Sequence, residues 1–126
     1  MNAPQAEKLV RAYVDGWREN NLAGILGTLV PDCLIIESHG PTYRGAARVR
    51  QWVMSWFAEG SIVDRWDITA FCSVGSLAAF EWEFECTVAG QHYRIDGASV
   101  AELAGGKIAG LREYRRTEPP YEWQPA

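Results

Sequence analysis

The chain has 126 residues, of which 48% are hydrophobic and 22% charged, and its formal net charge is -4. This length suits one domain over residues 1–126. Basic residues scattered along an acidic chain argue against a nucleic-acid or anionic-membrane partner. The N-terminus lacks a signal-peptide pattern, and no apolar run reaches membrane-spanning length. Three cysteines without a C-x-x-C spacing are typical of reduced core thiols, so we expect a cytoplasmic protein.

Helical spacing of apolar residues predicts two helices at the start of the chain. Between Ala6 and Trp17 apolar side chains recur at intervals of three and four, which is the pattern of one helical face. Asn21 is a suitable cap for a shorter second helix, whose apolar face extends to Leu29 and which Pro31 ends. The β-rich residues 33–36 then predict a first strand.

A third helix is predicted from Gly45 to Gly60, and after it the apolar period falls from 3.6 to 2. Four strands are expected at residues 62–72, 77–88, 91–103 and 107–116, joined by short glycine-containing turns that favour antiparallel hairpins. The predicted fold is therefore α+β. Three helices, with one strand between the second and the third, pack on a strongly curved antiparallel sheet that forms a conical barrel around a cavity.

The outer face of this sheet is expected to be acidic. In "FEWEFEC", residues 80–86, apolar side chains alternate with Glu81, Glu83 and Glu85. Bare like charges would repel one another, so we expect basic residues to neutralise them across a homodimer interface on this face. The candidates are Arg94, Arg112 and Arg116.

Three short motifs give the chain a family resemblance. "PDC" precedes the first strand, "YRG" precedes the third helix, and "GKIAGLREY" forms the last strand. Over roughly residues 5–116 the chain resembles the nuclear-transport-factor-2-like superfamily, and within it SnoaL-type polyketide cyclases, ketosteroid isomerases and limonene epoxide hydrolases. The resemblance implies the fold. It leaves the activity open, because this fold carries many chemistries and also non-enzymes.

The resemblance to ketosteroid isomerases implies three site positions. Their aspartate base falls on Glu37 and their helix tyrosine on Tyr13, while their second, protonated carboxyl position falls on Ser99. A serine there implies weaker stabilisation of a dienolate. Of the limonene epoxide hydrolase triad, one position aligns with Glu113. The other two fall on Phe80 and Trp82, so that triad is missing.

The residues themselves leave the role of each candidate open. Glu37 lies on the same side of its strand as Ile35; buried in a cavity, it is a proton carrier near neutral pH, whereas at the strand end it pairs with Arg44. Tyr13 lies on the apolar face of the first helix. Its hydroxyl donates either to a substrate oxygen or to a backbone carbonyl.

Two further polar groups lie close to these positions in the predicted fold. His39 follows Glu37 by two residues and either relays a proton or turns outward with the following Gly-Pro. Glu113 and Arg115 share a strand face and either position a ligand or join a surface salt-bridge network. No paired ligand spacing predicts a metal site.

Broad aromatic side chains suit a flat, apolar ligand, or else fill the cavity themselves. The expected substrate-binding residues are Trp17, Trp52, Trp56, Trp66, Trp82, Phe84, Leu111 and Arg115. The leading hypothesis is a cofactor-independent enzyme that moves a proton next to a carbonyl, as an isomerase, cyclase or dehydratase. The alternative is a non-catalytic ligand-binding module or dimeric scaffold.

Overall fold

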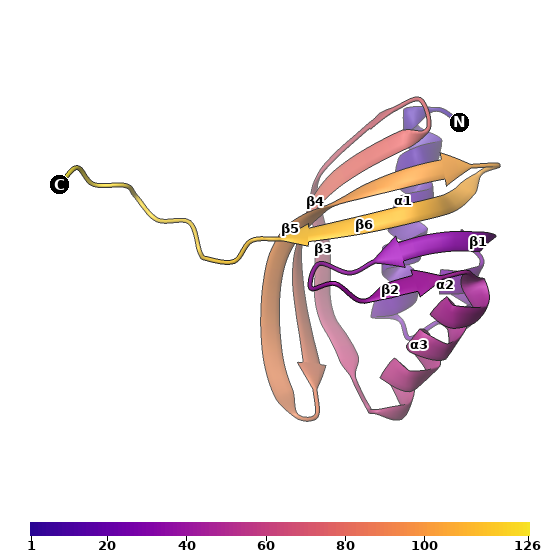
Figure 1. The fold of residues 1–126 in the computed structure, drawn as a ribbon, viewed down its shortest axis with the longest axis horizontal. Helices are drawn as coiled ribbons and strands as arrows, with labels where there is room; N and C mark the ends of the chain where they lie inside the picture. Colours follow the sequence, from indigo (N-terminus) through magenta and orange to yellow (C-terminus); the bar gives the residue numbers. More distant parts are fainter.

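The computed structural model describes all 126 residues as three helices that cover one face of a curled sheet (Figure 1). The helices are α1 (Ala3–Arg18), α2 (Leu22–Leu26) and α3 (Ala46–Ala58). The strands are β1 (Leu29–Ile36), β2 (Thr42–Arg44), β3 (Ile62–Val74), β4 (Leu77–Val88), β5 (Gln91–Ala104) and β6 (Lys107–Arg115). Their order across the sheet is β2-β1-β6-β5-β4-β3. The α+β prediction is confirmed, although the sheet curls around α1 without closing into a barrel.

Helix α1 is the element around which the sheet curls. Asn2 caps it by accepting the backbone N–H of Gln5, whose side chain accepts the Asn2 N–H in return. The apolar stripe predicted from the sequence is buried against the inner face of the sheet. Because Tyr13 and Trp17 belong to this stripe, both project from α1 toward the concave side of the sheet.

The structure corrects the prediction between the second and third helices. Helix α2 ends at Leu26, so Leu29 and Pro31 lie in β1 and not on or after the helix. Strand β1 pairs in parallel with β6, through Ile35 and Leu111, which makes the sheet mixed and not wholly antiparallel. The stretch predicted as a turn also contains β2, which pairs antiparallel with β1.

The remaining strands form the predicted antiparallel hairpins. Phe84 pairs with Ile95 and Trp82 with Gly97, so the two-residue turn between β4 and β5 sets the expected register. A Cβ atom at Gly97 would lie 2.2 Å from the Tyr114 carbonyl oxygen and 2.9 Å from the Trp82 ring. A glycine is therefore required where this ring lies across β5.

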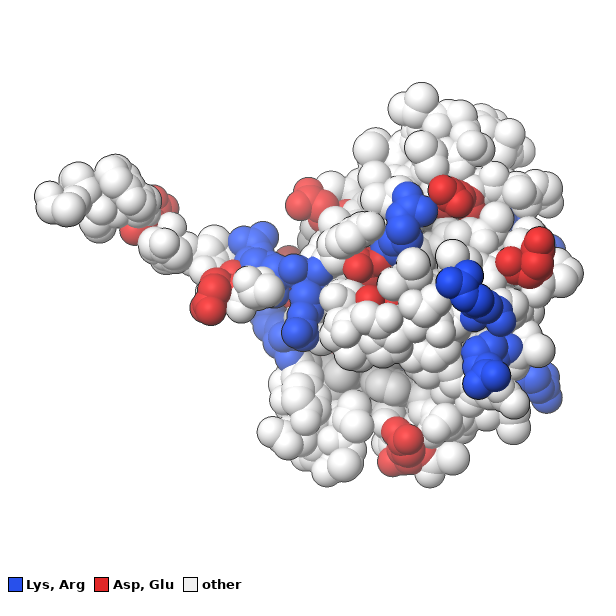
Figure 2. Space-filling model, viewed as in Figure 1, with Lys and Arg blue, Asp and Glu red and all other residues white.

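Two of the three glutamates on the outer face of the sheet, Glu83 and Glu85, are neutralised within the chain. Arg65 forms ion pairs with Glu83 and Glu85, and Arg94 pairs with Glu83. Arg94 is thus a basic partner of these glutamates, as predicted, but the ion pair lies within one chain and not across a dimer interface. Arg112 pairs with Glu102 instead. Basic and acidic side chains are interspersed over the body in Figure 2. Dimerisation through this face stays a prediction.

Beyond β6 the chain contains no further helix or strand and extends away from the body (Figure 1). Tyr121 and Trp123 in this tail are exposed. None of the helices has the length and apolar character needed to cross a bilayer.

Candidate active site

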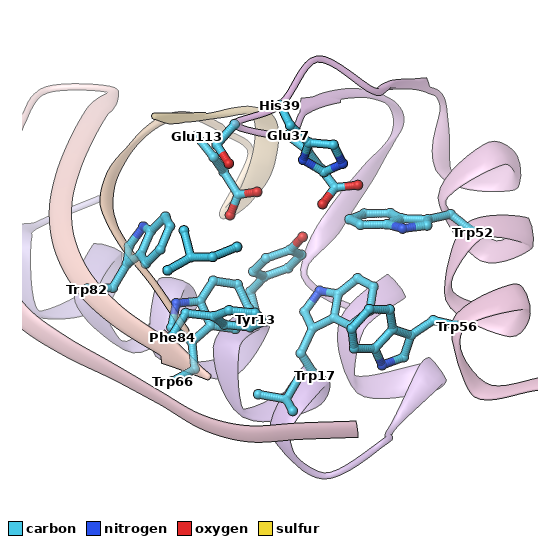
Figure 3. A pocket seen from close by; sticks show the side chains of 13 residues that line it. Tyr13, Trp17, Glu37, His39, Trp52, Trp56, Trp66, Trp82, Phe84 and Glu113 are labelled. Carbon is cyan, nitrogen blue, oxygen red and sulfur yellow. The ribbon is translucent and has the colours of Figure 1, made fainter. Parts of the chain in front are cut away.

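A hollow of about 270 Å³ lies between α1, α3 and the concave face of the sheet. It falls near the lower end of the volumes of about 300–1,000 Å³ that small-ligand pockets have. Its lining is mostly aromatic, and two carboxyl groups and a phenol point into it (Figure 3). The lining residues are Tyr13, Trp17, Glu37, Ser38, His39, Trp52, Trp56, Val63, Trp66, Trp82, Phe84, Ile95 and Glu113.

Glu37 reaches the hollow from the turn that follows β1. Its backbone N–H donates to the Pro41 carbonyl at 2.9 Å, and its own carbonyl accepts the Gly40 N–H at 3.0 Å. On the same side of the strand Ile35 is fully buried, and the Glu37 carboxyl group continues that side into the hollow (Figure 3). The alternative partner Arg44 is exposed and forms no ion pair with Glu37.

Tyr43 on β2 holds the Glu37 carboxyl group in place. Its hydroxyl donates to Glu37 Oε1 at 2.6 Å, and its ring stacks on Trp52 with centroids 4.0 Å apart and planes 9° apart. Burial, together with this hydrogen bond, raises the pKa of Tyr43, so the phenol keeps its proton. Sequence reasoning missed Tyr43, because its stretch was interpreted as a turn and no local pattern links it to Glu37.

Glu113 on β6 is the second carboxyl group in the hollow. Burial, and to a smaller extent the negative charge of Glu37, together raise its pKa to about 8. Its remaining accessible surface faces the hollow, and it has no hydrogen bond or ion pair within the chain. At neutral pH Glu113 is therefore mainly a carboxylic acid, which donates a hydrogen bond, opposite Glu37.

The hydroxyl of Tyr13 points toward the space between these two carboxyl groups (Figure 3). The ring is buried and makes edge contacts with Trp17 and Trp66 at centroid distances of 6.5 and 6.2 Å. Burial and then the charge of Glu113 raise its pKa well above the ordinary value. No protein group accepts the proton of this hydroxyl. The alternative prediction, in which the hydroxyl of a core tyrosine donates to a backbone carbonyl, is therefore wrong.

Three residues expected at the site lie outside the lining. Ser99 accepts a hydrogen bond from Trp82 Nε1 at 2.8 Å and is buried outside the hollow. Leu111 is buried in the core, and Arg115 is exposed at the end of β6, beyond the hollow. Conversely Val63 and Ile95 line the hollow and were missed, although the pairing of Ile95 with Phe84 follows from strand alternation.

His39 lines the mouth of the hollow and is itself exposed. The other histidine, His92, lies on the outer face of the sheet, where it contacts Glu85 at 2.9 Å. The chain contains no group of three or more His, Cys, Asp or Glu side chains placed to hold a metal ion.

The raised pKa of Glu113 predicts a pH-dependent stability. Between pH 4.5, where an ordinary glutamate titrates, and about pH 8, the unfolded chain releases a proton that the folded chain retains. Stability therefore falls as pH rises through this window. Glu113→Gln removes the ionisable group and should stabilise the fold by about 3 kcal/mol near pH 7.

Thermal and urea unfolding from pH 4.5 to pH 9 measures this effect. The matched control is Glu81→Gln, because Glu81 lies on the outer face and has no ion pair. We expect the gain from Glu113→Gln to grow with pH and the control to show no such trend. A gain that is the same at every pH would contradict the assigned pKa.

Comparisons with known proteins agree with this architecture. The model of the SnoaL-like domain family matches residues 10–111. An LEH-like epoxide hydrolase from M. tuberculosis superposes with a TM-score of 0.82 at 15% identity, over 90% of this chain and 84% of that chain. A candidate polyketide cyclase from Xanthomonas campestris pv. campestris superposes with a TM-score of 0.75 at 19% identity, over 90% and 92% of the two chains.

A third solved structure is a protein of unknown function with a cystatin-like fold from Methylobium petroleophilum PM1. It superposes with a TM-score of 0.73 at 26% identity, over 97% of this chain and 82% of that chain. No curated protein matches the sequence. The family match spans most of the chain, from α1 into β6; it includes Glu37 and ends two residues before Glu113. The chain belongs to the SnoaL-like domain family.

Proposed function

We propose that the protein is an enzyme that transfers a proton next to a carbonyl group of a small, flat and apolar molecule, without a cofactor. The observation that carries the proposal is the convergence of Glu37, Glu113 and Tyr13 in one aromatic hollow. When the environments of two carboxyl groups favour different protonation states, the ionised group is usually assigned as the base and the protonated group as the acid. Here Glu37 is the base and Glu113 the acid.

The reaction begins when the Glu37 carboxylate removes a proton from the carbon beside the carbonyl. The electron pair of the C–H bond becomes the C=C bond of an enolate, and the carbonyl electron pair moves to oxygen. Tyr13 and protonated Glu113 donate hydrogen bonds to that oxygen, where the charge develops. Glu37 then returns the proton to carbon, with His39 at the mouth as a relay. Return to a different carbon isomerises the ligand.

Two features of the hollow favour this chemistry. Tyr43 fixes one oxygen of Glu37, which leaves the other free to face the ligand. The aromatic walls exclude water and thereby strengthen each hydrogen bond to the developing oxyanion. No Lys or Arg side chain lines the hollow, which favours a neutral ligand over an anionic one.

The residues at two positions argue against epoxide hydrolysis as the reaction. A candidate polyketide cyclase shares the fold. The epoxide hydrolase from M. tuberculosis shares it too, but the two positions that would complete an Asp-Arg-Asp group here are Phe80 and Trp82, both buried. Their side chains have no carboxylate or guanidinium group with which to open an epoxide.

The test is hydrogen exchange at the α-carbon of 2-tetralone, a flat bicyclic ketone, in heavy water. Proton NMR should show faster deuterium incorporation with the protein than with buffer alone. Because Glu113 must be protonated, the rate should fall as pH rises through about 8. Glu113→Gln, whose amide N–H also donates, should keep the rate above that pH.

A second outcome of the same experiment would favour the non-catalytic alternative. If 2-tetralone bound and perturbed the aromatic NMR signals while its α-protons exchanged no faster than in buffer, the protein would be a ligand-binding module. An exchange rate that did not fall above pH 8 would contradict the role assigned to Glu113.

A further inference from the structure

Several indole N–H groups in the wall of the hollow have no hydrogen-bond partner. They belong to Trp17, Trp56 and Trp66, whereas the indole of Trp82 donates to Ser99. Buried donors in proteins are nearly always paired, and an unpaired one costs roughly 1–3 kcal/mol. Since these side chains line a ligand-sized hollow, an acceptor carried by the ligand is a natural partner.

The indole of Trp17 is unpaired and lies next to Tyr13, one of the proposed oxyanion donors. It lies one helical turn after Tyr13 on the same face of α1, and the two rings meet edge to face. Figure 3 shows the Trp17 ring nitrogen on the side of the indole nearest the Tyr13 hydroxyl. The Trp17 N–H lies near the Tyr13 oxygen without a well-aligned hydrogen bond to it, so both groups can still donate a proton to the same region.

The titration of Tyr13 agrees with this geometry. Burial and the charge of Glu113 raise the pKa of Tyr13, and the Trp17 indole N–H acts in the opposite direction by favouring the ionised oxygen. The direction of the N–H is fixed, because Trp52 and Trp56 pack against the Trp17 ring at centroid distances of 4.7 and 6.0 Å. A donor held in this way is preorganised for an oxyanion.

We propose that the indole N–H of Trp17 and the hydroxyl of Tyr13 together bind one oxygen of the ligand. This inference rests on the proposed function, since that oxygen is the carbonyl oxygen on which the enolate charge develops. A carbonyl, enolate or phenol oxygen has lone pairs for two donors. The hollow therefore selects ketones and their enols and discriminates against hydrocarbons of the same shape.

The experiment compares 2-naphthol with naphthalene, which has the same ring system but no oxygen. In protein labelled with nitrogen-15 at tryptophan, 2-naphthol should shift the Trp17 indole N–H signal downfield and naphthalene should not. Trp82, whose N–H is already bonded to Ser99, is the internal control. Because the spectrum is that of the unaltered protein, this measurement does not depend on a variant that folds.

Trp17→Phe supplies the affinity measurement. It should weaken 2-naphthol binding about fivefold more than naphthalene binding, the value of one hydrogen bond, because the smaller ring changes the apolar wall for both probes alike. Trp123→Phe is the matched control, because Trp123 lies exposed in the tail. Equal effects of Trp17→Phe on both probes, or a Trp17 signal that responds equally to both, would overturn the inference.

The outcomes separate this inference from the proposed function. If 2-naphthol binding depends on Tyr13 but not on Trp17, the inference fails and the proposed function stands. If binding depends on Trp17 but 2-tetralone undergoes no catalysed exchange, the shared oxygen site stands and the proposed reaction fails. If neither probe binds, or binding depends on neither residue, both fail.

Discussion

Glu37→Gln should slow the α-deuterium exchange of 2-tetralone by about 10²–10⁴-fold, which is the contribution of a general base. Glutamine has nearly the shape of glutamate, and its amide oxygen still accepts the Tyr43 hydroxyl, which donates at 2.6 Å in the structure. The turn that carries the side chain is held by backbone hydrogen bonds to Pro41 and Gly40 and does not need the charge. The loss should therefore appear in kcat with the fold intact.

A second effect of Glu37→Gln follows from the facing acids. The charge of Glu37 contributes to the raised pKa of Glu113, so removing it should lower the Glu113 pKa below about 8. Carbon-13 NMR titration of the glutamate carboxyl groups measures that change, and Glu81→Gln is the control on the opposite face of the sheet. If Glu37→Gln exchanged 2-tetralone as fast as the unaltered protein, Glu37 would not be the base.

The parts of the fold that depend on local pattern could be predicted from the sequence. The apolar stripe from Ala6 to Trp17 predicts α1, and it is the stripe that the sheet buries. The alternation in "FEWEFEC" predicts which face of β4 is core. Together with a two-residue turn it sets the pairing of Phe84 with Ile95, because in a hairpin the turn length determines the register.

The pairings between distant segments could not be predicted in the same way. The parallel contact of β1 with β6 joins residues near opposite ends of the chain, and no local pattern encodes it. Pro31 favoured the end of a helix, yet it lies in β1 where the register with β6 shifts between Leu29 and Leu34. Such an irregularity tolerates a residue without a backbone N–H.

The residues of the candidate site show the same difference between what a local pattern predicts and what depends on contacts between distant segments. Tyr13, Glu37 and Glu113 were candidates because the family resemblance assigns those positions and the place of each on its helix or strand fits a side chain that faces the cavity. The role of Glu113 depends on facing Glu37 across the hollow, and that of Tyr43 depends on a neighbouring strand. The hydroxyl of Ser99 was expected in the site, but it accepts a hydrogen bond from Trp82 and is buried outside the hollow, a placement that alternation alone does not specify.

Tyr13→Phe should lower the exchange rate of 2-tetralone by about 10²–10³-fold, the usual loss when one oxyanion donor is removed. The phenyl ring keeps the edge contacts with Trp17 and Trp66, at centroid distances of 6.5 and 6.2 Å. The hydroxyl donates to no protein group, and the Trp17 N–H beside it already lacks a well-aligned partner, so removing the hydroxyl leaves no further buried group unpaired. Stability should therefore be retained while kcat falls.

The matched control is Tyr114→Phe. It removes a hydroxyl from an exposed tyrosine on β6 and should have no effect on the exchange rate. In the double variant Tyr13→Phe and Trp17→Phe the losses should not simply add, because both donors serve one oxygen. Turnover that survived Tyr13→Phe unchanged would mean that the charge develops elsewhere in the hollow. Glu113, the other donor that faces Glu37, would then be the first group to test.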